Sequence, residues 1–311
     1  MLEKRRPVSV VIVNWRGAQN THECIRSLLS QNWRNFELLV VDNGSENGEV
    51  DCLRETFGQQ IVIDETGANL GFPAACNRAF SRAVNRGFDY VFVVNNDLRL
   101  DSNALSILFK TAETDDSIGA VVPKVYYWDR PNVIQCAGGR LFLGLGMTFH
   151  RGINVTDSAK FDREIDTEFA EASACLYRVS ALKRVGFFDE SLFAYWEDTD
   201  LSVRLRRMGY RLVYSPGAKA WHKVSQSAPP HTKTFLFLRN AITFVKRYGK
   251  GMRLVSAAFS ILGLQAPILM VQSFSRASSY VEKRRVLVAP FQAVLWHLNK
   301  ARVSDSVWKP I

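Results

Sequence analysis

Short apolar runs, each ended by polar turn residues and separated by helical segments, constrain the fold of this chain most strongly. Such runs cover Val8–Val13, Phe36–Val41 and Tyr90–Val94. A weaker run covers Gln60–Ile63 and is followed by a helix that begins near Pro73. Strands separated by helices of this length form a parallel sheet with right-handed crossovers. We therefore predict an α/β fold with a mostly parallel, Rossmann-like sheet flanked by helices, in which ligands bind at the carboxyl ends of the strands.

The net charge of +10 comes entirely from one end of the sequence. Residues 239–311 hold 12 basic and 2 acidic side chains, whereas residues 1–238 hold 28 of each. A nucleic-acid enzyme would carry its positive charge along the main groove, so we expect no nucleic-acid partner. The distribution predicts a neutral domain over residues 1–238 and a basic amphipathic helical tail over residues 239–311.

Several chemistries lack their usual sequence signals. The five cysteines are scattered and never spaced as CxxC, which suggests neither a disulfide framework nor a zinc site and fits a reducing cytosol. The sequence also lacks GxxxxGK[ST], HExxH and GxSxG motifs, so a P-loop NTPase, a zincin and a serine hydrolase are unsupported.

Polar side chains follow three of the predicted strands at the point where each strand ends. Asn14 follows the run Val8–Val13, Asp42 follows Phe36–Val41, and Asp97 comes after Tyr90–Val94. A carboxylate at a strand end, such as Asp97, is well placed to bind a hard cation that bridges the oxygens of a pyrophosphate. An ordinary turn is the alternative interpretation of Asn95-Asn96-Asp97, because Asn and Asp are common turn formers.

Two further signals are weaker when taken alone. Asn69-Leu70-Gly71-Phe72-Pro73, together with Asn77, joins a glycine turn to a helix start, which suits either a phosphate or ribose contact or a simple tight turn. His222 could complete the ligand set of a metal, although a lone histidine is more often structural.

The segment Phe187–Asp200 is the most informative stretch because it places five carboxylates among aromatic and aliphatic residues. A carboxylate held among apolar groups can have a raised pKa and act as a general base. We interpret Asp200 as the partner of an ion pair with Arg204. Helix capping alone would not require the surrounding aromatics, so Glu197 and Asp198 are the candidates for chemistry.

Taken in order, these motifs resemble the inverting glycosyltransferases of family 2, which have the GT-A fold. The resemblance covers Val8 to about Tyr248 and is closest to the rhamnosyltransferase-like branch that builds bacterial cell-surface glycans. It rests on Val-Ile-Val-Asn-Trp at 11–15, Val-Asp-Asn-Gly-Ser at 41–45, Asn-Leu-Gly-Phe at 69–72, Asn-Asn-Asp at 95–97, Phe-Asp-Glu at 188–190, Glu-Asp-Thr-Asp-Leu at 197–201, His222 and Arg239-Asn240.

The resemblance implies a role for each matching residue. Asp97 corresponds to the metal ligand that ends the DxD motif, here with Asn95 in place of the first Asp, and His222 to a second ligand of Mg²⁺ or Mn²⁺. Asp198 corresponds to the catalytic base, with Glu197 as a second catalytic candidate. The implied contacts of the nucleotide sugar are Asn14, Asp42, Asn69, Gly71, Asn77 and Asn96.

The implied reaction is the transfer of one sugar, with inversion, from a nucleotide-diphosphate sugar to a hydroxyl of a saccharide acceptor. The branch favours dTDP-rhamnose as donor and a polyprenyl-diphosphate-linked acceptor, with a UDP-sugar donor (galactosyl, glucosyl or galactofuranosyl) as the alternative. The QxxRW motif of processive synthases is absent. A nucleotidyltransferase would need a glycine-rich basic signature near the N-terminus, which is not seen, and a non-catalytic nucleotide-sugar-binding relative would not need Asp97, Asp198 and His222.

The basic tail contains the apolar stretch Leu254–Val271, which we interpret as too short and too interrupted for a membrane span. Flanking basic residues favour an interfacial helix on an anionic membrane surface. This predicts a cytoplasmic protein that is peripheral at the inner face of the cell membrane. The alternative is a helical cap packed on the protein, or a homodimer formed through the C-terminal helices.

Overall fold

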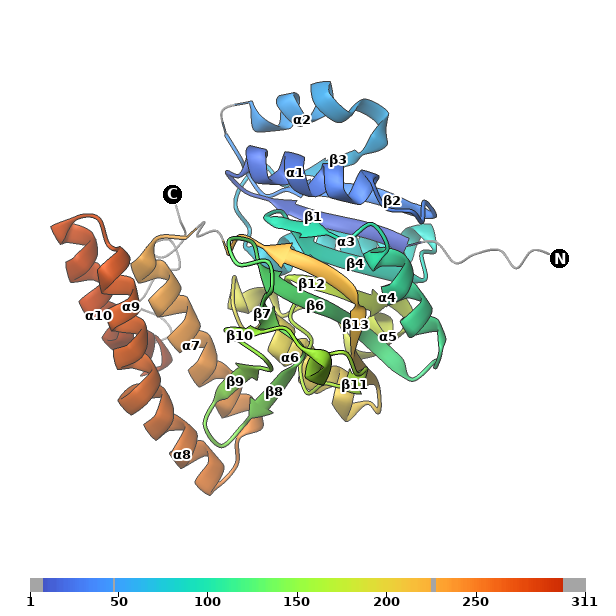
Figure 1. Ribbon diagram of the computed structural model, residues 1–311. Coiled ribbons are helices and arrows are strands. Elements are labelled where there is room, and N and C mark those ends of the chain that lie inside the picture. The colour runs from blue at the N-terminus through green and yellow to red at the C-terminus, as the bar shows by residue number, and fades with distance from the viewer. Residues whose placement is uncertain (1–7, 47, 225–227, 299–311) are drawn as a thin grey trace. The chain divides into compact units, whose positions relative to one another are not determined.

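The computed structural model describes residues 8–46, 48–224 and 228–298, which form two compact units (Figure 1). The first unit contains the described residues up to 140, 150–190 and 198–224. The second contains residues 141–149, 191–197 and 228–298. The division predicted after residue 238 falls inside a single helix, Pro230–Tyr248. Residues 299–311 of the predicted tail lie outside the described residues.

The order of elements follows the alternation of apolar runs and helical segments. The strands are β1 (Val8–Asn14), β2 (Phe36–Asp42), β3 (Val62–Glu65), β4 (Tyr90–Asn95), β5 (Leu98–Leu100), β6 (Ile118–Tyr127), β7 (Val133–Cys136), β8 (Gly139–Phe142), β9 (Met147–His150), β10 (Val155–Thr156), β11 (Ile165–Asp166), β12 (Ala174–Arg178) and β13 (Arg211–His222). The helices are α1 (Ala18–Leu29), α2 (Glu49–Phe57), α3 (Phe72–Arg86), α4 (Ala104–Glu113), α5 (Val179–Val185), α6 (Glu197–Arg207), α7 (Pro230–Tyr248), α8 (Met252–Ser260), α9 (Ala266–Arg276) and α10 (Tyr280–Leu298).

A central sheet with helices on both faces confirms the predicted α/β fold. Its main path runs β10-β7-β6-β12-β4-β1-β2-β3. The four strands β3, β2, β1 and β4 are parallel, whereas β12 joins β4 and β6 antiparallel. Asn14 pairs with Asp42, and Val13 pairs with Asn95. The carboxyl ends of β1, β2 and β4 therefore lie level at one edge of the sheet.

Successive residues of the central strands point to opposite faces, and each face is covered. Val10 and Ile12 pack in one apolar cluster with residues of α1 and α4, such as Ile25. Val11 packs in a second cluster with residues of α3 and α5, such as Phe80. Burial on both faces explains why these strands are continuous apolar runs rather than alternating ones.

The second unit is mainly helical, with α7 packed against α9 and α10. A π turn, Ile261–Gln265, joins α8 to α9, so that Met252–Arg276 is one helix of 25 residues. By length and composition this helix could cross a membrane. Only 22% of its apolar stretch of 18 residues is buried. The expectation that this stretch is too short for a span is therefore wrong, because the helix continues beyond Leu254–Val271 at both ends.

Gly44 gives a test of how tightly the turn after β2 is packed. It has φ +78°, and a Cβ there would lie 2.5 Å from the main-chain carbonyl carbon of Ala68. Gly48 has a similar φ of +73°, but no described atom lies within 4 Å of the position of its Cβ. We expect Gly48→Ala to cost about 1–2 kcal/mol from backbone strain alone. Gly44→Ala should lower the free energy of unfolding by clearly more, because the backbone of Ala68 must also move.

Urea unfolding followed by far-ultraviolet circular dichroism measures both changes. Equal losses in the two variants would show that the contact between Gly44 and Ala68 is not as close as the structure has it.

Candidate active site

Asn14 connects the ends of β1 and β2. Its Nδ2, which has two hydrogens to donate, lies 2.8 Å from Asp42 Oδ1, 3.0 Å from Ser45 Oγ and 3.2 Å from Glu49 Oε2. Its Oδ1 accepts a hydrogen bond from Thr21 Oγ1 at 2.5 Å. Asn14 is fully buried, so these bonds satisfy polar atoms that water cannot reach. The predicted contact of Asn14 with a nucleotide stays a prediction.

A second asparagine, Asn43, ties the turn after β2 to the loop before α3. Its Nδ2 donates to Asn69 Oδ1 at 3.0 Å, and its Oδ1 accepts from the N–H of Leu70 at 3.0 Å. Asn69 Oδ1 also accepts from the N–H of Gly71 at 3.0 Å. In the sequence, Asn43 stands out only as a member of the motif Val-Asp-Asn-Gly-Ser at 41–45. Its link to Asn69 had no local signal, because the partner lies 26 residues away.

Asn77 and Asn96, both predicted to contact the donor, make internal hydrogen bonds. Asn77 Nδ2 donates to the carbonyl oxygen of Phe188 and to Glu190 Oε1, both at 2.9 Å. Asn77 Oδ1 accepts from the N–H of Phe188 at 3.0 Å. Asn96 Nδ2 donates to Thr21 Oγ1 at 3.0 Å. Asn77 thus fixes the Phe-Asp-Glu motif against α3, a link that the order of motifs did not reveal.

Asp97 and His222, separated by 125 residues, meet at the end of β4. Strand β13 pairs antiparallel with β5, which places His222 opposite Leu98. The Nε2 of His222 then lies 3.0 Å from Oδ1 of Asp97, and both side chains are buried. The Nδ1 of His222 lies 2.9 Å from Oε1 of Gln135. If Nδ1 donates to this amide oxygen, Nε2 presents its lone pair toward Asp97.

This pair fits a divalent cation. A carboxylate oxygen and an imidazole lone pair at 3.0 Å are two acceptors that need a proton or a cation between them. Burial disfavours a charged imidazole, but the hydrogen bond and the charge of Asp97 outweigh burial and raise the pKa of His222 above its ordinary value. Oxygen and imidazole ligands together suit ions such as Mn²⁺. Gln135, which no sequence motif marked, orients the imidazole.

Asp198 lies in the first turn of α6 with its carboxylate held by the main chain. Its Oδ2 accepts from the N–H of Ala172 at 3.2 Å, and its Oδ1 from the N–H of Thr199 at 2.6 Å. Burial, and next the negative charge of Glu171, raise the pKa of the Asp198 carboxyl above its ordinary value, against the effect of these hydrogen bonds. A carboxyl in this environment is suited to accept a proton. Glu171 is a further residue that no sequence motif marked.

The other carboxylates of the same stretch have different environments. Asp200 is buried and forms the predicted ion pair with Arg204, Oδ2 to Nε, at 2.8 Å. Glu197 begins α6 and is 7% exposed. The interpretation of Asp200 as structural is confirmed, while a catalytic role of Glu197 remains a prediction.

The segment that leads into α6 is strained and firmly held within the second unit. Phe193, Tyr195 and Trp196 have φ values of +62°, +69° and +74°, which cost L-residues about 1–3 kcal/mol each. Asn240 Nδ2 lies 2.7–2.9 Å from the carbonyl oxygens of Leu192, Ala194 and Tyr195.

Arg239 reinforces this attachment from the same helix. Its Nη2 donates to the carbonyl oxygens of Ser191 at 3.1 Å and Leu192 at 2.7 Å, and its Nε donates to Asn240 Oδ1 at 2.8 Å. Both side chains are almost completely buried. Arg239 and Asn240 therefore fix the conformation of residues 191–195. The motif Arg239-Asn240 did not predict this role, because the segment it holds lies more than 40 residues earlier in the sequence.

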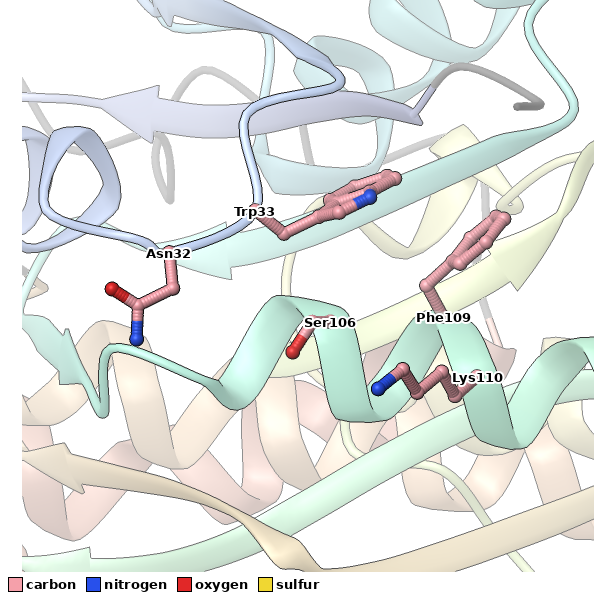
Figure 2. Close-up of a pocket in the computed structure, with 5 residues that line it drawn as sticks. All are labelled: Asn32, Trp33, Ser106, Phe109 and Lys110. Atoms are coloured by element: carbon pink, nitrogen blue, oxygen red, sulfur yellow. The ribbon is translucent and has the colours of Figure 1, made fainter. Parts of the chain in front are cut away.

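A hollow elsewhere in the first unit is unrelated to these residues. It has a volume of about 290 Å³ and is lined by Asn32, Trp33, Ser106, Phe109 and Lys110 (Figure 2). Trp33 stacks on Phe109 with ring centroids 4.9 Å apart. Asn32 and Trp33 precede β2, so the hollow lies toward the amino end of that strand, whereas Asp42 ends it.

Comparison with known proteins gives matches in sequence and in fold. The family model "Glycosyl transferase family 2" matches residues 9–186. The chain is 29% identical over 259 residues to N-acetylglucosaminyl-diphospho-decaprenol L-rhamnosyltransferase of Mycobacterium tuberculosis, a match that covers 74% of this chain and 83% of the relative. It is 19% identical over 221 residues to the poly-beta-1,6-N-acetyl-D-glucosamine synthase of Staphylococcus aureus, covering 71% and 50% of the two chains.

Two solved structures share the fold. GalNAc-T7 with UDP, GalNAc and Mn²⁺ superposes with a TM-score of 0.63 at 13% identity, covering 99% of this chain and 58% of that one. The mannosyltransferase PcManGT of Pyrobaculum calidifontis, in complex with GDP-Man and Mn²⁺, gives a TM-score of 0.60 at 17% identity, covering 96% and 89%.

Asn240 allows the attachment of residues 191–195 to be tested. Asn240→Ala removes this donor from the carbonyl oxygens of Ala194 and Tyr195, whereas that of Leu192 keeps Arg239, so we expect the free energy of unfolding to fall by about 2–3 kcal/mol. Thr243→Val on the same helix removes only a local hydrogen bond to the carbonyl oxygen of Arg239 and should change it by about 0.5 kcal/mol or less. Chemical denaturation of both variants measures the difference, and similar losses would contradict the proposed attachment.

Proposed function

The chain belongs to glycosyl transferase family 2, and on this premise we propose that it transfers one sugar, preferably rhamnose, to a lipid-linked saccharide. The donor of the family is a nucleotide sugar. The relative from Mycobacterium tuberculosis, an L-rhamnosyltransferase named for an N-acetylglucosaminyl-diphospho-decaprenol, supports rhamnose and a polyprenyl-diphosphate acceptor. The observation that carries the chemistry is that the Asp97–His222 pair and the carboxylate of Asp198 belong to the same compact unit.

In the proposed reaction, Asp198 takes the proton of an acceptor hydroxyl. The oxygen attacks the anomeric carbon from the face opposite the nucleotide, and the bond from that carbon to the diphosphate breaks with its electron pair on the departing oxygen. A single displacement inverts the anomeric centre. The N–H groups of Ala172 and Thr199 hold the Asp198 carboxylate in place for this step.

We propose that Asp97 and His222 hold Mg²⁺ or Mn²⁺. When bound, such an ion offsets the negative charge that develops on the leaving diphosphate. Asn95 replaces an acidic residue, so Asp97 supplies the carboxylate of this motif. Gln135 keeps the imidazole of His222 oriented toward Asp97.

The nucleotide side of the proposed site is formed at the ends of β1 and β2 and by the loop before α3. We propose that Asn14 and Asp42 shape the position of base and ribose. Asn69, Gly71, Asn77 and Asn96 would shape the position of the diphosphate. Their internal hydrogen bonds hold these segments rigid, which favours binding with little ordering cost.

The helices of the second unit supply the proposed contact with an anionic membrane surface. Phe259 and Val271 are 80% and 71% exposed on the helix Met252–Arg276. The basic residues Arg253 and Arg276 lie at or near its two ends. An exposed apolar face beside basic side chains is typical of helices that associate with anionic bilayers. We propose that the protein acts in the cytoplasm at the inner face of the cell membrane, where a lipid-linked acceptor would be found.

Two substitutions separate the proposed chemistry from donor binding. Asp198→Asn should lower the rate of transfer by at least about 100-fold, because the amide cannot accept the proton, while the Kd for the nucleotide sugar stays within a factor of about 2. Asp97→Ala should instead weaken binding of the donor in the presence of Mn²⁺. Release of nucleoside diphosphate measures transfer, and calorimetry measures binding with dTDP-rhamnose and UDP-sugars as alternative donors.

Near-normal turnover of Asp198→Asn would contradict its assignment as the base. A donor that binds without any release of nucleoside diphosphate, with any acceptor supplied, would favour a non-catalytic relative. Tighter binding of a UDP-sugar than of dTDP-rhamnose would contradict rhamnose as the transferred sugar and favour the sugar of that UDP donor.

Membrane association is tested by flotation with vesicles that contain anionic phospholipid. The full chain should float, and the double variant Phe259→Ser, Val271→Ser should float several-fold less because apolar surface is lost. The matched control Leu70→Ser, Met208→Ser removes exposed apolar side chains from the first unit and should float like the unaltered chain. Equal flotation of the two double variants would reject this surface.

A further inference from the structure

Three side chains that are distant in the sequence, and that do not include Asp97 or His222, gather in the first unit. They are Cys136 at the end of β7, His150 at the end of β9 and Glu171 in the segment before β12. One ligand atom from each of the three lies within 4.8 Å of the others. Sulfur, imidazole nitrogen and carboxylate oxygen are the three donor types that zinc accepts in proteins.

The main chain around these residues is fixed by hydrogen bonds, so their proximity does not depend on flexible side chains alone. The N–H of Ala137 donates to the carbonyl oxygen of Arg151 at 2.9 Å, and the N–H of Arg151 to that of Gly138 at 2.8 Å. The N–H of Glu168 donates to the carbonyl oxygen of Gly139 at 2.9 Å. These bonds join the segments that carry Cys136, His150 and Glu171.

Two atoms of the cluster are buried without a hydrogen-bond partner. They are Nδ1 of His150 and Oε2 of Glu171, which lie 3.5 Å apart. A buried polar atom without a partner is costly, and two such atoms facing each other point to a missing cation. A protonated His150 paired with Glu171 is the alternative, and the metal content of the purified protein distinguishes the two.

The separation of two of the ligand atoms suits zinc. In tetrahedral coordination with bonds of about 2.0–2.3 Å, ligand atoms lie about 3.3–3.8 Å from one another. The separation of 3.5 Å between His150 and Glu171 already falls in this range. Burial, followed by the negative charge of Glu171, raises the pKa of the Cys136 thiol, so a bound zinc ion would have to displace its proton.

We propose that Cys136, His150 and Glu171 bind a Zn²⁺ ion at a site distinct from the Asp97–His222 pair. The scattered cysteines of the sequence gave no such signal, because the three ligands come from separate segments without regular spacing. The ion would fasten the ends of β7 and β9 to residue 171. The next residue, Ala172, donates its N–H to Asp198. The zinc site would therefore position the proposed base without contacting the substrate.

The test measures metal content and affinity of the full-length protein, independently of sugar transfer. Purified protein supplied with Zn²⁺ and then desalted should retain about one zinc ion per chain, as measured by elemental mass spectrometry. Cys136→Ser and His150→Ala should each weaken zinc binding by at least about 100-fold, since even loss of a supporting residue costs about 10–100-fold. Replacement by Co²⁺ should give a thiolate-to-metal absorption band that Cys136→Ser abolishes.

Matched controls separate this site from others. Cys52→Ser removes an exposed free cysteine and should leave zinc binding unchanged. Asp97→Ala should also leave it unchanged, because the proposed site for Mg²⁺ or Mn²⁺ is a different one. Circular dichroism verifies that each variant is folded. If Cys136→Ser or His150→Ala does not fold, Glu171→Gln replaces it as the variant that removes a zinc ligand. Failure of the unaltered protein to retain zinc, or equal loss in the Cys52 or Asp97 variant, would overturn the proposal.

Discussion

The parallel register of β1 with β2 and β4 is the constraint on which the rest of the first unit depends. Both faces of these strands are covered by helices, so their side chains must be apolar along most of their length. Polar residues are tolerated where the strands end. Because Asn14 pairs with Asp42 and Val13 with Asn95, three such ends meet at one edge. The candidate site is thus a consequence of how the sheet is buried.

The features that were predictable from sequence depend on neighbours along the chain. The apolar runs and their terminating turns identified the strands, and the spacing of four residues identified the ion pair of Asp200 with Arg204. The same local reasoning misjudged Leu254–Val271. The stretch contains Gly263 and Pro267, yet the chain stays helical through them, because a π turn at Ile261–Gln265 takes up the break in the hydrogen-bond ladder that a proline causes inside a helix.

The features that escaped prediction depend on long-range pairing or on local strain. His222 reaches Asp97 only because β13 changes its register with β6 between Ser215 and Lys219 and then pairs with β5. Nothing local in the sequence specifies that irregularity. Phe193, Tyr195 and Trp196 adopt positive φ values that their own preferences oppose, and the groups that hold residues 191–195 lie on α7. A segment stabilised against its local preference has no local signature.

Charged residues have different environments in the two parts of the sequence. In the first unit, cations are used inside the structure: Lys124 is completely buried, and its Nζ lies 3.0 Å from Asp157 and 2.6 Å from Asp162. A buried cation requires such partners, so this lysine is matched by acidic residues of the same unit. From residue 239 onward, 2 acidic residues cannot balance 12 basic ones. This excess of basic over acidic side chains is what the proposed contact with an anionic lipid surface would use, together with the exposed apolar residues of Met252–Arg276.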